Sequence, residues 1–359
     1  MKFLNIIQLG FVFAGCFLGA GFVSGQELWQ FFGIYGKNGF WGMILAIILF
    51  FIFGYIVLTL SQKTGIILMD EIVIPQTRSC SESSKSLGKL RNFIGFIQVF
   101  FIIGIYIIMC AGAGALINQL LGLHIIVGSS IFCFFVCFVS LKGIRGVINV
   151  FSLFVPPLIL GAVIIGICAV NKNGFSLVLQ ENQDTIFKNP AISAIVYVSY
   201  NFFGSIGILA PVAQKYKKYK SKKILVAGTA TGCLILTLIS FCILMAMNTD
   251  RESTFSQLPM LFIAEKTNIF VGFAYAFFLL GAMFSTSLSS LVAVCEYVKE
   301  KYNFQRKKSA ILTILLSFLA CLLSLVGFDK LIGTIYPLCG IFGVFALVAI
   351  VAHYIKVEK

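Results

Sequence analysis

Long apolar runs separated by short polar breaks follow one another along almost the whole chain. A helix that crosses a bilayer needs about 20 predominantly apolar residues. The runs are continuous rather than alternating with a period of two, which favours helices over the strands of a barrel. We therefore predict an all-α membrane protein with about ten transmembrane helices in a single integral domain over residues 1–359. The expected spans are 4–32, 40–61, 93–121, 124–141, 146–170, 191–213, 224–247, 269–298, 309–327 and 331–354.

Composition supports lipid as the solvent of this chain. Of its 359 residues, 59% are apolar and 11% are charged, too few charges for a soluble domain of this length. The net charge of +14 could suggest nucleic acid, but the basic residues lie between the spans, as in the stretch 215–223. Most of them fall on one side if both termini are cytoplasmic, as the positive-inside rule requires. We predict a multi-pass protein of the bacterial cytoplasmic (inner) membrane, with no nucleic-acid partner and an oligomeric state that the sequence leaves open.

The predicted spans divide into two halves of opposite orientation. Five precede the outside loop at 171–190 and five follow it, so an inverted repeat of residues 4–170 and 191–354 is geometrically allowed. The long connections inside the halves, 62–92 and 248–268, occupy equivalent positions and face opposite sides of the membrane. We therefore expect a five-plus-five inverted repeat.

The first span of each half carries a pattern typical of a broken helix. Span 1 contains Gly15, Gly19, Gly21 and Gly25, and span 6 contains the polar and glycine-rich stretch 200–207. Glycine inside a helix costs about 1 kcal/mol relative to alanine, and main-chain groups freed by a break cannot face hydrocarbon. We expect helices 1 and 6 to be discontinuous around a cavity; the alternative is that these glycines only allow close helix packing.

Polar groups converge near the middle of four spans. They are Gly19 to Gly21, Tyr106, Asn201 and the stretch 285–287. Buried hydroxyls and amides without partners cost about 1 to 3 kcal/mol each, which indicates mutual hydrogen bonds or a ligand. The N–H end of a broken helix suits a carboxylate and its carbonyl end suits a small cation. Ser285, Thr286 and Ser289 could complete a sodium shell, or could simply bond their own helix.

Glu27 is a carboxylate well inside an apolar span. Such a group costs roughly 2.5 to 3.5 kcal/mol on insertion scales, so it needs a partner or a proton. We hypothesise that Glu27, with Gln26, either titrates during transport or gates the outer vestibule. The alternative is a carboxylate near the outer interface that reaches water.

The segment Gly19–Phe32, GAGFVSGQELWQFF, resembles the first-span signature of the YkvI-type bacterial membrane proteins. These resemble in turn the amino acid, polyamine and organocation (APC) transporter superfamily, whose members share the LeuT fold of five plus five inverted spans. The resemblance covers the whole chain in span number and loop placement, although only this motif is specific in sequence. It implies a solute between the broken parts of spans 1 and 6, beside spans 3 and 8.

Carried over residue by residue, the resemblance implies two sets of site residues. The substrate-binding set is Gly19, Ala20, Gly21, Phe22, Tyr106, Tyr200, Asn201 and Gly204. The sodium set is Gly15 and Leu18 by their carbonyls with Ser285 and Thr286 by their hydroxyls, and Ser289 and Ser290 are alternatives one turn further on. Ser289 and Glu27 join the ion-coupling residues. Glu27 does so because of its place inside an apolar span and not because of the resemblance.

The leading functional hypothesis is a cation-coupled secondary transporter of an amino acid or a similar small zwitterionic or organic solute. A nutrient receptor on the same fold, like the spore-germination receptors, would bind ligand without net transport. An enzyme is not expected, because His124 and His353 lie near span ends and no metal-ligand cluster appears. No cofactor is predicted beyond Na+ or H+ as the coupling ion, and the predicted partners are a small-molecule solute and membrane lipid.

Overall fold

The computed structural model describes residues 2–76, 82–173, 187–217, 222–256, 258–326 and 328–358. These residues form helices and the loops between them, and no strand occurs in the described ranges. The first half consists of α1 (Lys2–Gly15), α2 (Ala20–Val23), α3 (Gln26–Phe31), η1 (Gly33–Tyr35), α4 (Lys37–Thr64), α5 (Met69–Val73), α6 (Glu82–Leu121), α7 (Ile125–Ser140) and α8 (Ile144–Asn173). The second consists of α9 (Pro190–Lys215), α10 (Lys222–Thr249), η3 (Arg251–Phe255), α11 (Pro259–Thr267), α12 (Ile269–Tyr302), α13 (Arg306–Leu323), η4 (Ser324–Val326) and α14 (Phe328–Glu358).

Each predicted span falls on helix, and seven of the described helices are long and apolar enough to cross a membrane. Three shorter apolar helices, Phe3–Gly15, Ile125–Ser140 and Ile159–Asn171, coincide with further predicted spans. The count of ten and the inverted repeat therefore stay predictions. Helix α6 extends beyond its predicted span, since it begins at Glu82, well before residue 93, and residues 62–92 also hold α5. Part of the predicted outside loop, 174–186, lies outside the described residues.

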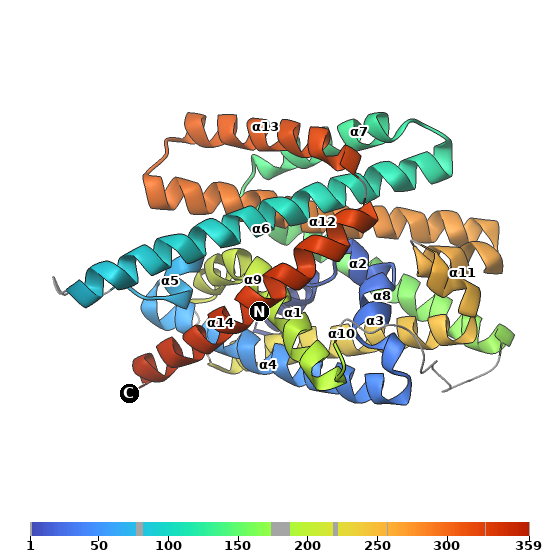
Figure 1. Ribbon diagram of the computed structural model, residues 1–359, viewed down its shortest axis with the longest axis horizontal. Coiled ribbons are helices and arrows are strands. Elements are labelled where there is room, and N and C mark those ends of the chain that lie inside the picture. Colours follow the sequence, from blue (N-terminus) through green and yellow to red (C-terminus); the bar gives the residue numbers. More distant parts are fainter. Residues whose placement is uncertain are drawn as a thin grey trace.

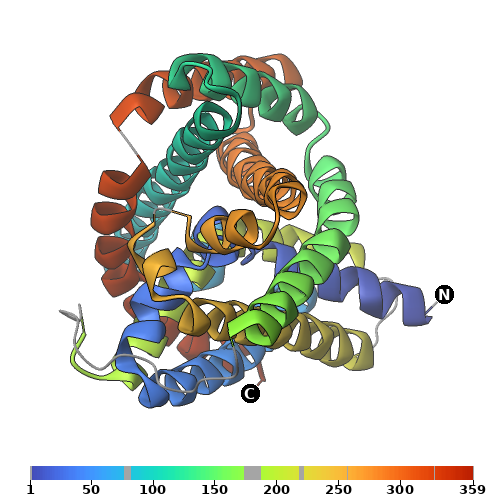
Figure 2. The same cartoon turned by 90° about the vertical axis from the view of Figure 1, so that its right-hand side faces the viewer.

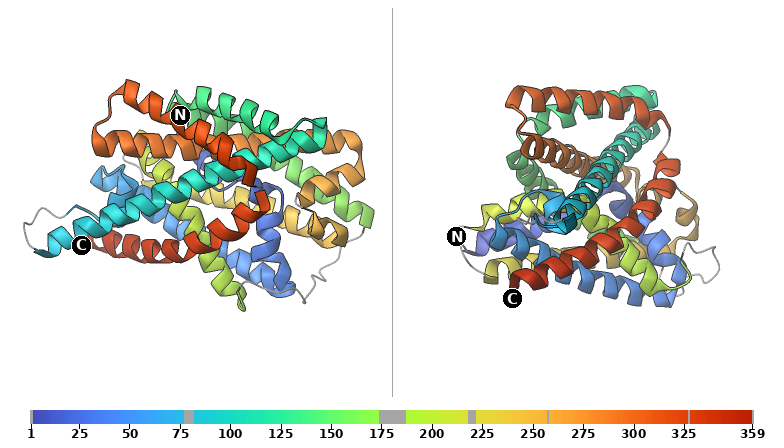
Figure 3. Two further views of the ribbon diagram at one scale, coloured as in Figure 1. Left: turned by 45° about the horizontal axis from the view of Figure 1, so that its top comes forward. Right: turned by 60° about the vertical axis from the view of Figure 1, so that its left-hand side comes forward.

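The helices surround the short segments α2 and α3. Figures 1 and 2 show α7 and α13 side by side along one edge, with α6 and α12 next to them. At the opposite edge α4 packs on α10 and α9, and α1 packs on α10. Figure 3 shows α14 running obliquely across the bundle, where it contacts α9 and α6. This arrangement brings α6, α9, α12 and α14 around the middle of span 1.

The outer faces of the bundle are strongly apolar. Trp41, Phe134, Phe270, Phe318 and Phe345 are each between 66% and 79% exposed, and many aliphatic residues beside them are similarly uncovered. A soluble monomer rarely leaves so much continuous apolar surface in water. The exposed faces match the apolar runs of the sequence and are those of a membrane-embedded protein.

The predicted break in span 1 is confirmed. Helix α1 ends at Gly15, residues 16–19 have no regular helical structure, and α2 resumes at Ala20. A second interruption at Ser24 and Gly25 separates α2 from α3. Gly25 has φ +86°, a left-handed conformation that glycine adopts without strain.

The predicted break in span 6 is wrong, because α9 is a continuous helix from Pro190 to Lys215. Its glycines serve packing instead: a Cβ on Gly204 would lie 3.1 Å from Ile105, and one on Gly207 would lie 3.0 Å from the Cβ of Ala293. The Asn201 amide donates to the Tyr197 carbonyl at 2.9 Å, and the Ser205 hydroxyl donates to the Asn201 carbonyl. These polar groups bond their own helix, so they need no break.

Candidate functional site

The interruption after α1 leaves main-chain carbonyl groups without helical partners. The Phe17 carbonyl accepts from the Gly19 N–H at 2.9 Å. In the described ranges no main-chain donor reaches the carbonyl oxygens of Gly15 and Leu18. Carbonyls freed in this way are the groups with which broken membrane helices coordinate small cations.

Two distant segments hold the next part of span 1 in place. The Met260 N–H of α11 donates to the Ser24 carbonyl at 2.9 Å, and the Tyr275 hydroxyl of α12 donates to the Val23 carbonyl. These bonds satisfy carbonyls that the interruption at Ser24 and Gly25 would otherwise leave unpaired. The position of α2 therefore depends on α11 and α12 as well as on its own sequence.

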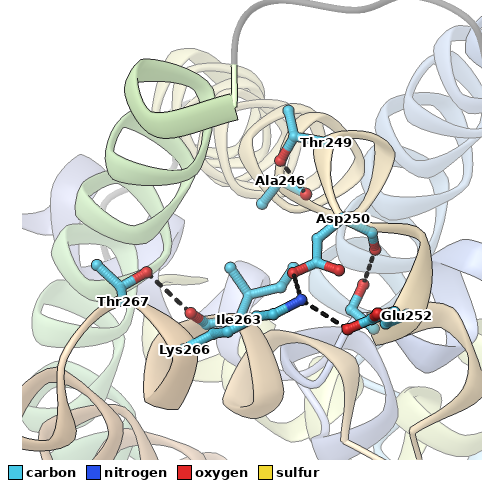
Figure 4. Close-up of polar contacts among 8 residues, drawn as sticks. Ala246, Thr249, Asp250, Glu252, Ile263, Lys266 and Thr267 are labelled. Carbon is cyan, nitrogen blue, oxygen red and sulfur yellow. Dashed lines mark hydrogen bonds and ion pairs between the residues drawn. The ribbon is translucent and has the colours of Figure 1, made fainter.

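A cluster of charges anchors α11 in turn (Figure 4). Lys266 bonds to Asp250 at 2.9 Å and to Glu252 at 2.8 Å. Hydrogen bonds with Glu252 and Asp250 raise the pKa of Lys266 above its usual 10.5. The described parts of the predicted connection 248–268, residues 248–256 and 258–268, therefore support the broken helix.

A cavity of about 50 Å³ opens beside the break in span 1, with room for a few water molecules. Five elements of the chain enclose it: the break with α3, and helices α6, α9, α12 and α14. Its lining residues are Cys16, Phe17, Gly19, Glu27, Ile105, Tyr200, Asn201, Gly204, Ser205, Ile208, Thr286, Ser289, Ser290 and Tyr336. Their polar atoms are mostly hydroxyl and carboxylate oxygens, so the cavity can accept hydrogen bonds and bind positive charge.

Glu27 is the charged residue of this lining. Its side chain is 5% exposed, and its Oε2 accepts a hydrogen bond of 2.8 Å from the Tyr200 hydroxyl. The carboxylate folds back from α3 onto α2, where it lies so close to Gly21 that a Cβ there would overlap it. Gly21 thus provides the room for the carboxylate, and Tyr200 fixes one of its oxygens.

The hydroxyls of α12 differ in how they are bonded. Ser285 donates to the Ala282 carbonyl at 2.9 Å, and Ser289 donates to the Thr286 carbonyl at 2.9 Å, each one turn back in its own helix. The Oγ1 of Thr286 is buried without a hydrogen-bond partner among the described residues. It lies 3.5 Å from the position of a Cβ on Gly19, against the break. Ser287 Oγ is also buried without a partner among the described residues, but of the two it is Thr286 that lies against Gly19 and lines the cavity.

The structure brings many of the sequence-predicted residues together at this cavity. Those that line it are Gly19, Glu27, Tyr200, Asn201, Gly204, Thr286, Ser289 and Ser290. Those that lie in the surrounding segments without lining it are Gly15, Leu18, Ala20, Gly21, Phe22 and Ser285. Tyr106 points elsewhere: its hydroxyl donates to Ser317 of α13 at 3.2 Å, and Ile105 is the α6 residue of the lining.

Sequence reasoning missed Tyr336 of α14. Its ring stacks on that of Tyr200, with centroids 4.9 Å apart and planes 12° apart, and it lines the cavity. A tyrosine in an apolar span carries no local signal of such a contact, because the partner lies in a distant helix. Within the described ranges no group of three or more His, Cys, Asp and Glu residues could hold a metal ion.

Comparisons with known proteins agree with this architecture. No family model matches the chain. The uncharacterized membrane protein YkvI of Bacillus subtilis (strain 168) is 25% identical over 339 residues, which are 93% of this chain and 91% of YkvI. The uncharacterized protein YyaD of the same organism is 24% identical over 342 residues, 94% of each chain. The homologues of this chain are YkvI-type membrane proteins.

Solved structures of similar shape are transporters. MhsT in complex with L-phenylalanine has a TM-score of 0.67 at 15% identity, over 97% of this chain and 91% of that one. A Na+-coupled sialic acid symporter has a TM-score of 0.68 at 16% identity, over 94% of this chain and 76% of the symporter. Inward-facing Mhp1 has a TM-score of 0.58 at 14% identity, over 94% of this chain and 73% of Mhp1. At these identities the likeness shows the fold, which is the LeuT fold implied by the first-span motif.

Proposed function

We propose that the protein is a secondary transporter that moves an amino acid or a similar small zwitterionic or organic solute by alternating access. The observation that carries this proposal is the cavity at the break in span 1, which four further helices enclose at the depth of the predicted membrane middle. Binding sites at broken helices are typical of such carriers. The structure of MhsT with L-phenylalanine, which has this fold, supports an amino acid as the solute class.

The cavity, of about 50 Å³, has room for only a few water molecules and would have to widen to hold an amino acid. Helices around the break would have to separate for a solute to enter, as in the rocking of one bundle against another. Alternating access supplies this opening on each side of the membrane in turn.

We further propose that sodium is the coupling ion and that it binds at the carbonyl end of the break. Gly15 and Leu18 would contribute their carbonyls, which lack main-chain donors, and Thr286 its unpartnered hydroxyl, with Ser285 beside it. Oxygens of this kind coordinate Na+ in broken-helix carriers. The Na+-coupled symporter of similar fold supports this assignment. A proton carried by Glu27 is the alternative coupling mode.

The membrane context completes the proposal. We propose residence in the bacterial cytoplasmic membrane with both termini on the inner side, because this orientation gathers most of the Lys and Arg residues there. The two halves, 4–170 and 191–354, would then form the inverted repeat on which the rocking motion depends.

Uptake into proteoliposomes tests the proposal. The purified protein is reconstituted and offered a labelled pool of amino acids with an inward sodium gradient, a proton gradient, both or neither. We expect accumulation that requires an imposed cation gradient and disappears with ionophores. Flux that continues without any gradient, or binding without flux as in a receptor, would contradict the transporter assignment.

A further inference from the structure

We propose that Glu27 selects solutes that carry a protonated amino group, by serving as the counter-charge to that group inside the cavity. This inference rests on the proposed transport function and names the residue that sets its charge specificity. It assigns Glu27 to the solute rather than to the coupling ion, to which the sequence pattern assigned it.

The charge of the cavity is the first support. Among the described residues that line it, Glu27 is the sole Asp or Glu, and none is Lys, Arg or His. The described ion pairs of the molecule also leave Glu27 out. A buried carboxylate without a basic partner is unfavourable unless it takes up a proton, so a positive ligand group that enters the cavity stabilises the ionised form of Glu27. An anionic solute would instead meet an uncompensated like charge.

The placement of the carboxylate is the second support. Oε2 is held by the Tyr200 hydroxyl at 2.8 Å, whereas the described residues give Oε1 no hydrogen bond. Gly21 leaves the room into which the side chain folds. The carboxylate is therefore held at the cavity by Tyr200 and packed through Oε1 against Gly21, and its oxygens keep lone pairs that can accept an N–H donor. Tyr200 and Gly21 are positioning residues in this arrangement.

Aromatic rings supply the third support. The rings of Phe17, Tyr200 and Tyr336 line the same cavity as Glu27, and the two tyrosine rings stack at 4.9 Å. Ring faces attract cations, and the attraction grows when water is excluded. Carboxylate and aromatic rings together therefore favour an organic ammonium ion. The lining offers no basic side chain for the carboxylate of a zwitterion, so an amine alone should suffice for binding.

Binding of matched probes tests this inference. The probes are 2-phenylethylamine, 2-phenylethanol and 3-phenylpropanoate, with n-butylamine, 1-butanol and butanoate as a smaller series. Each is titrated at neutral pH against the purified full-length protein in lipid nanodiscs, with sodium present. In each series we expect the amine to bind at least about 30-fold more tightly than the alcohol or the acid. A difference in affinity of this size is typical of a buried charge pair.

Variants identify the residue responsible. Glu27→Gln should bring the amine within about threefold of the alcohol, because the amide keeps the shape and loses the charge. Glu358→Gln, which removes a carboxylate that does not line the cavity and forms an ion pair with the exposed Lys63, should retain the full preference. Tyr200→Phe should lower amine affinity by a smaller factor, since the carboxylate remains but is less fixed.

Several results would overturn the inference. They are absence of amine binding in both series, equal or tighter binding of the acids, and a Glu27→Gln variant that keeps its amine preference while its sodium or pH dependence changes. The last result would place the coupling ion at Glu27. Amines that bind tightly but are not moved by any gradient would defeat the transport function and leave this inference standing. Gradient-driven uptake restricted to solutes without an amine would support the transport function and overturn the inference about Glu27.

Discussion

The ion pair between Asp70 of α5 and Lys301 of α12 should contribute strongly to stability. Lys301 Nζ lies 2.5 Å from Asp70 Oδ2 and also bonds to the Tyr297 hydroxyl. The Asp70 side chain is 1% exposed and that of Lys301 is 17% exposed. The pair ties the short helix of the connection between α4 and α6 to the helix that carries the hydroxyls of the cavity. Loss of this ion pair should therefore lower the stability of the fold more than it lowers the affinity for a ligand.

The size of the effect follows from distance and burial. At 2.5 Å and an effective dielectric constant of about 20, the gross attraction is about 7 kcal/mol, and desolvation offsets much of it. Breaking a buried pair from one side costs about 3 to 5 kcal/mol, because the other charge is left uncompensated. We expect Asp70→Asn to lower the free energy of unfolding by about 3 kcal/mol. This value is at the lower end of the range for a broken buried pair, because the amide can still accept a hydrogen bond from Lys301. Asp70→Asn with Lys301→Met should recover most of the loss, because no buried charge remains.

Reversible unfolding in mixed micelles, by titration with a denaturing detergent, measures these differences. The matched control is Glu358→Gln, which breaks the ion pair between Glu358 and Lys63. In this pair the Lys63 side chain is 34% exposed and that of Glu358 is 36% exposed. An exposed pair of this kind contributes little to stability, so Glu358→Gln should cost much less than Asp70→Asn. Equal losses for the Asp70 and Glu358 variants, or a double variant as unstable as Asp70→Asn alone, would refute the reasoning.

Three further predictions concern the break and its supports. Thr286→Val should raise the sodium concentration for half-maximal uptake about tenfold or more, because it removes an unpartnered oxygen, whereas Ser285→Ala should change it less. Gly21→Ala should weaken amine binding about tenfold by displacing the Glu27 carboxylate, with little change in thermal stability because a flexible side chain moves. Lys266→Met should lower thermal stability below pH 10.5, and its difference from the native protein should vanish as pH rises through the raised pKa of Lys266.

Each of these has a result that would contradict it. Unchanged sodium activation in Thr286→Val would remove this hydroxyl from the ion site. Gly88→Ala is the matched control, because the space around Gly88 is open. If both alanine variants weakened amine binding equally, Gly21 would not act by making room for the Glu27 carboxylate. A stability difference for Lys266→Met that persists well above pH 10.5 would mean that packing, and not charge, anchors α11.

Much of the fold could be predicted from the sequence because membrane helices leave a strong one-dimensional signal. Each apolar run lies on a helix, and the glycines of span 1 mark a true interruption. The polar positions near the middles of spans 1, 6 and 8 do face one cavity, which Gly19, Asn201 and Thr286 all line. Helix length, hydropathy and mid-span polarity are local properties, so a single sequence carries them.

Properties that depend on neighbouring helices could not be predicted in this way. Tyr106 is also a mid-span polar residue, but a hydroxyl on α13, that of Ser317, accepts its hydrogen bond away from the cavity. Tyr336 lines the cavity because α14 crosses next to α9, and nothing near it in the chain shows this. The early start of α6 at Glu82 was missed because its first turns are polar, and only apolar residues mark a span.

The contrast between span 1 and α9 shows why glycine content alone does not predict a broken helix. In α9 the space left by Gly204 and Gly207 is filled by Ile105 and Ala293. The helix therefore packs closely and runs on unbroken through Pro211, although this residue has no N–H to donate to the Gly207 carbonyl. In span 1 the carbonyls of Val23 and Ser24 find donors in Tyr275 and Met260, which lie more than two hundred residues away. An interruption in lipid is stable only where such partners exist. Because one helix is broken and the other is not, main-chain carbonyls without helical partners lie beside the cavity in span 1, whereas α9, α12 and α14 line it with side chains, apart from Gly204. Solute specificity should therefore reside in those side chains and in Glu27, where substitution can change it.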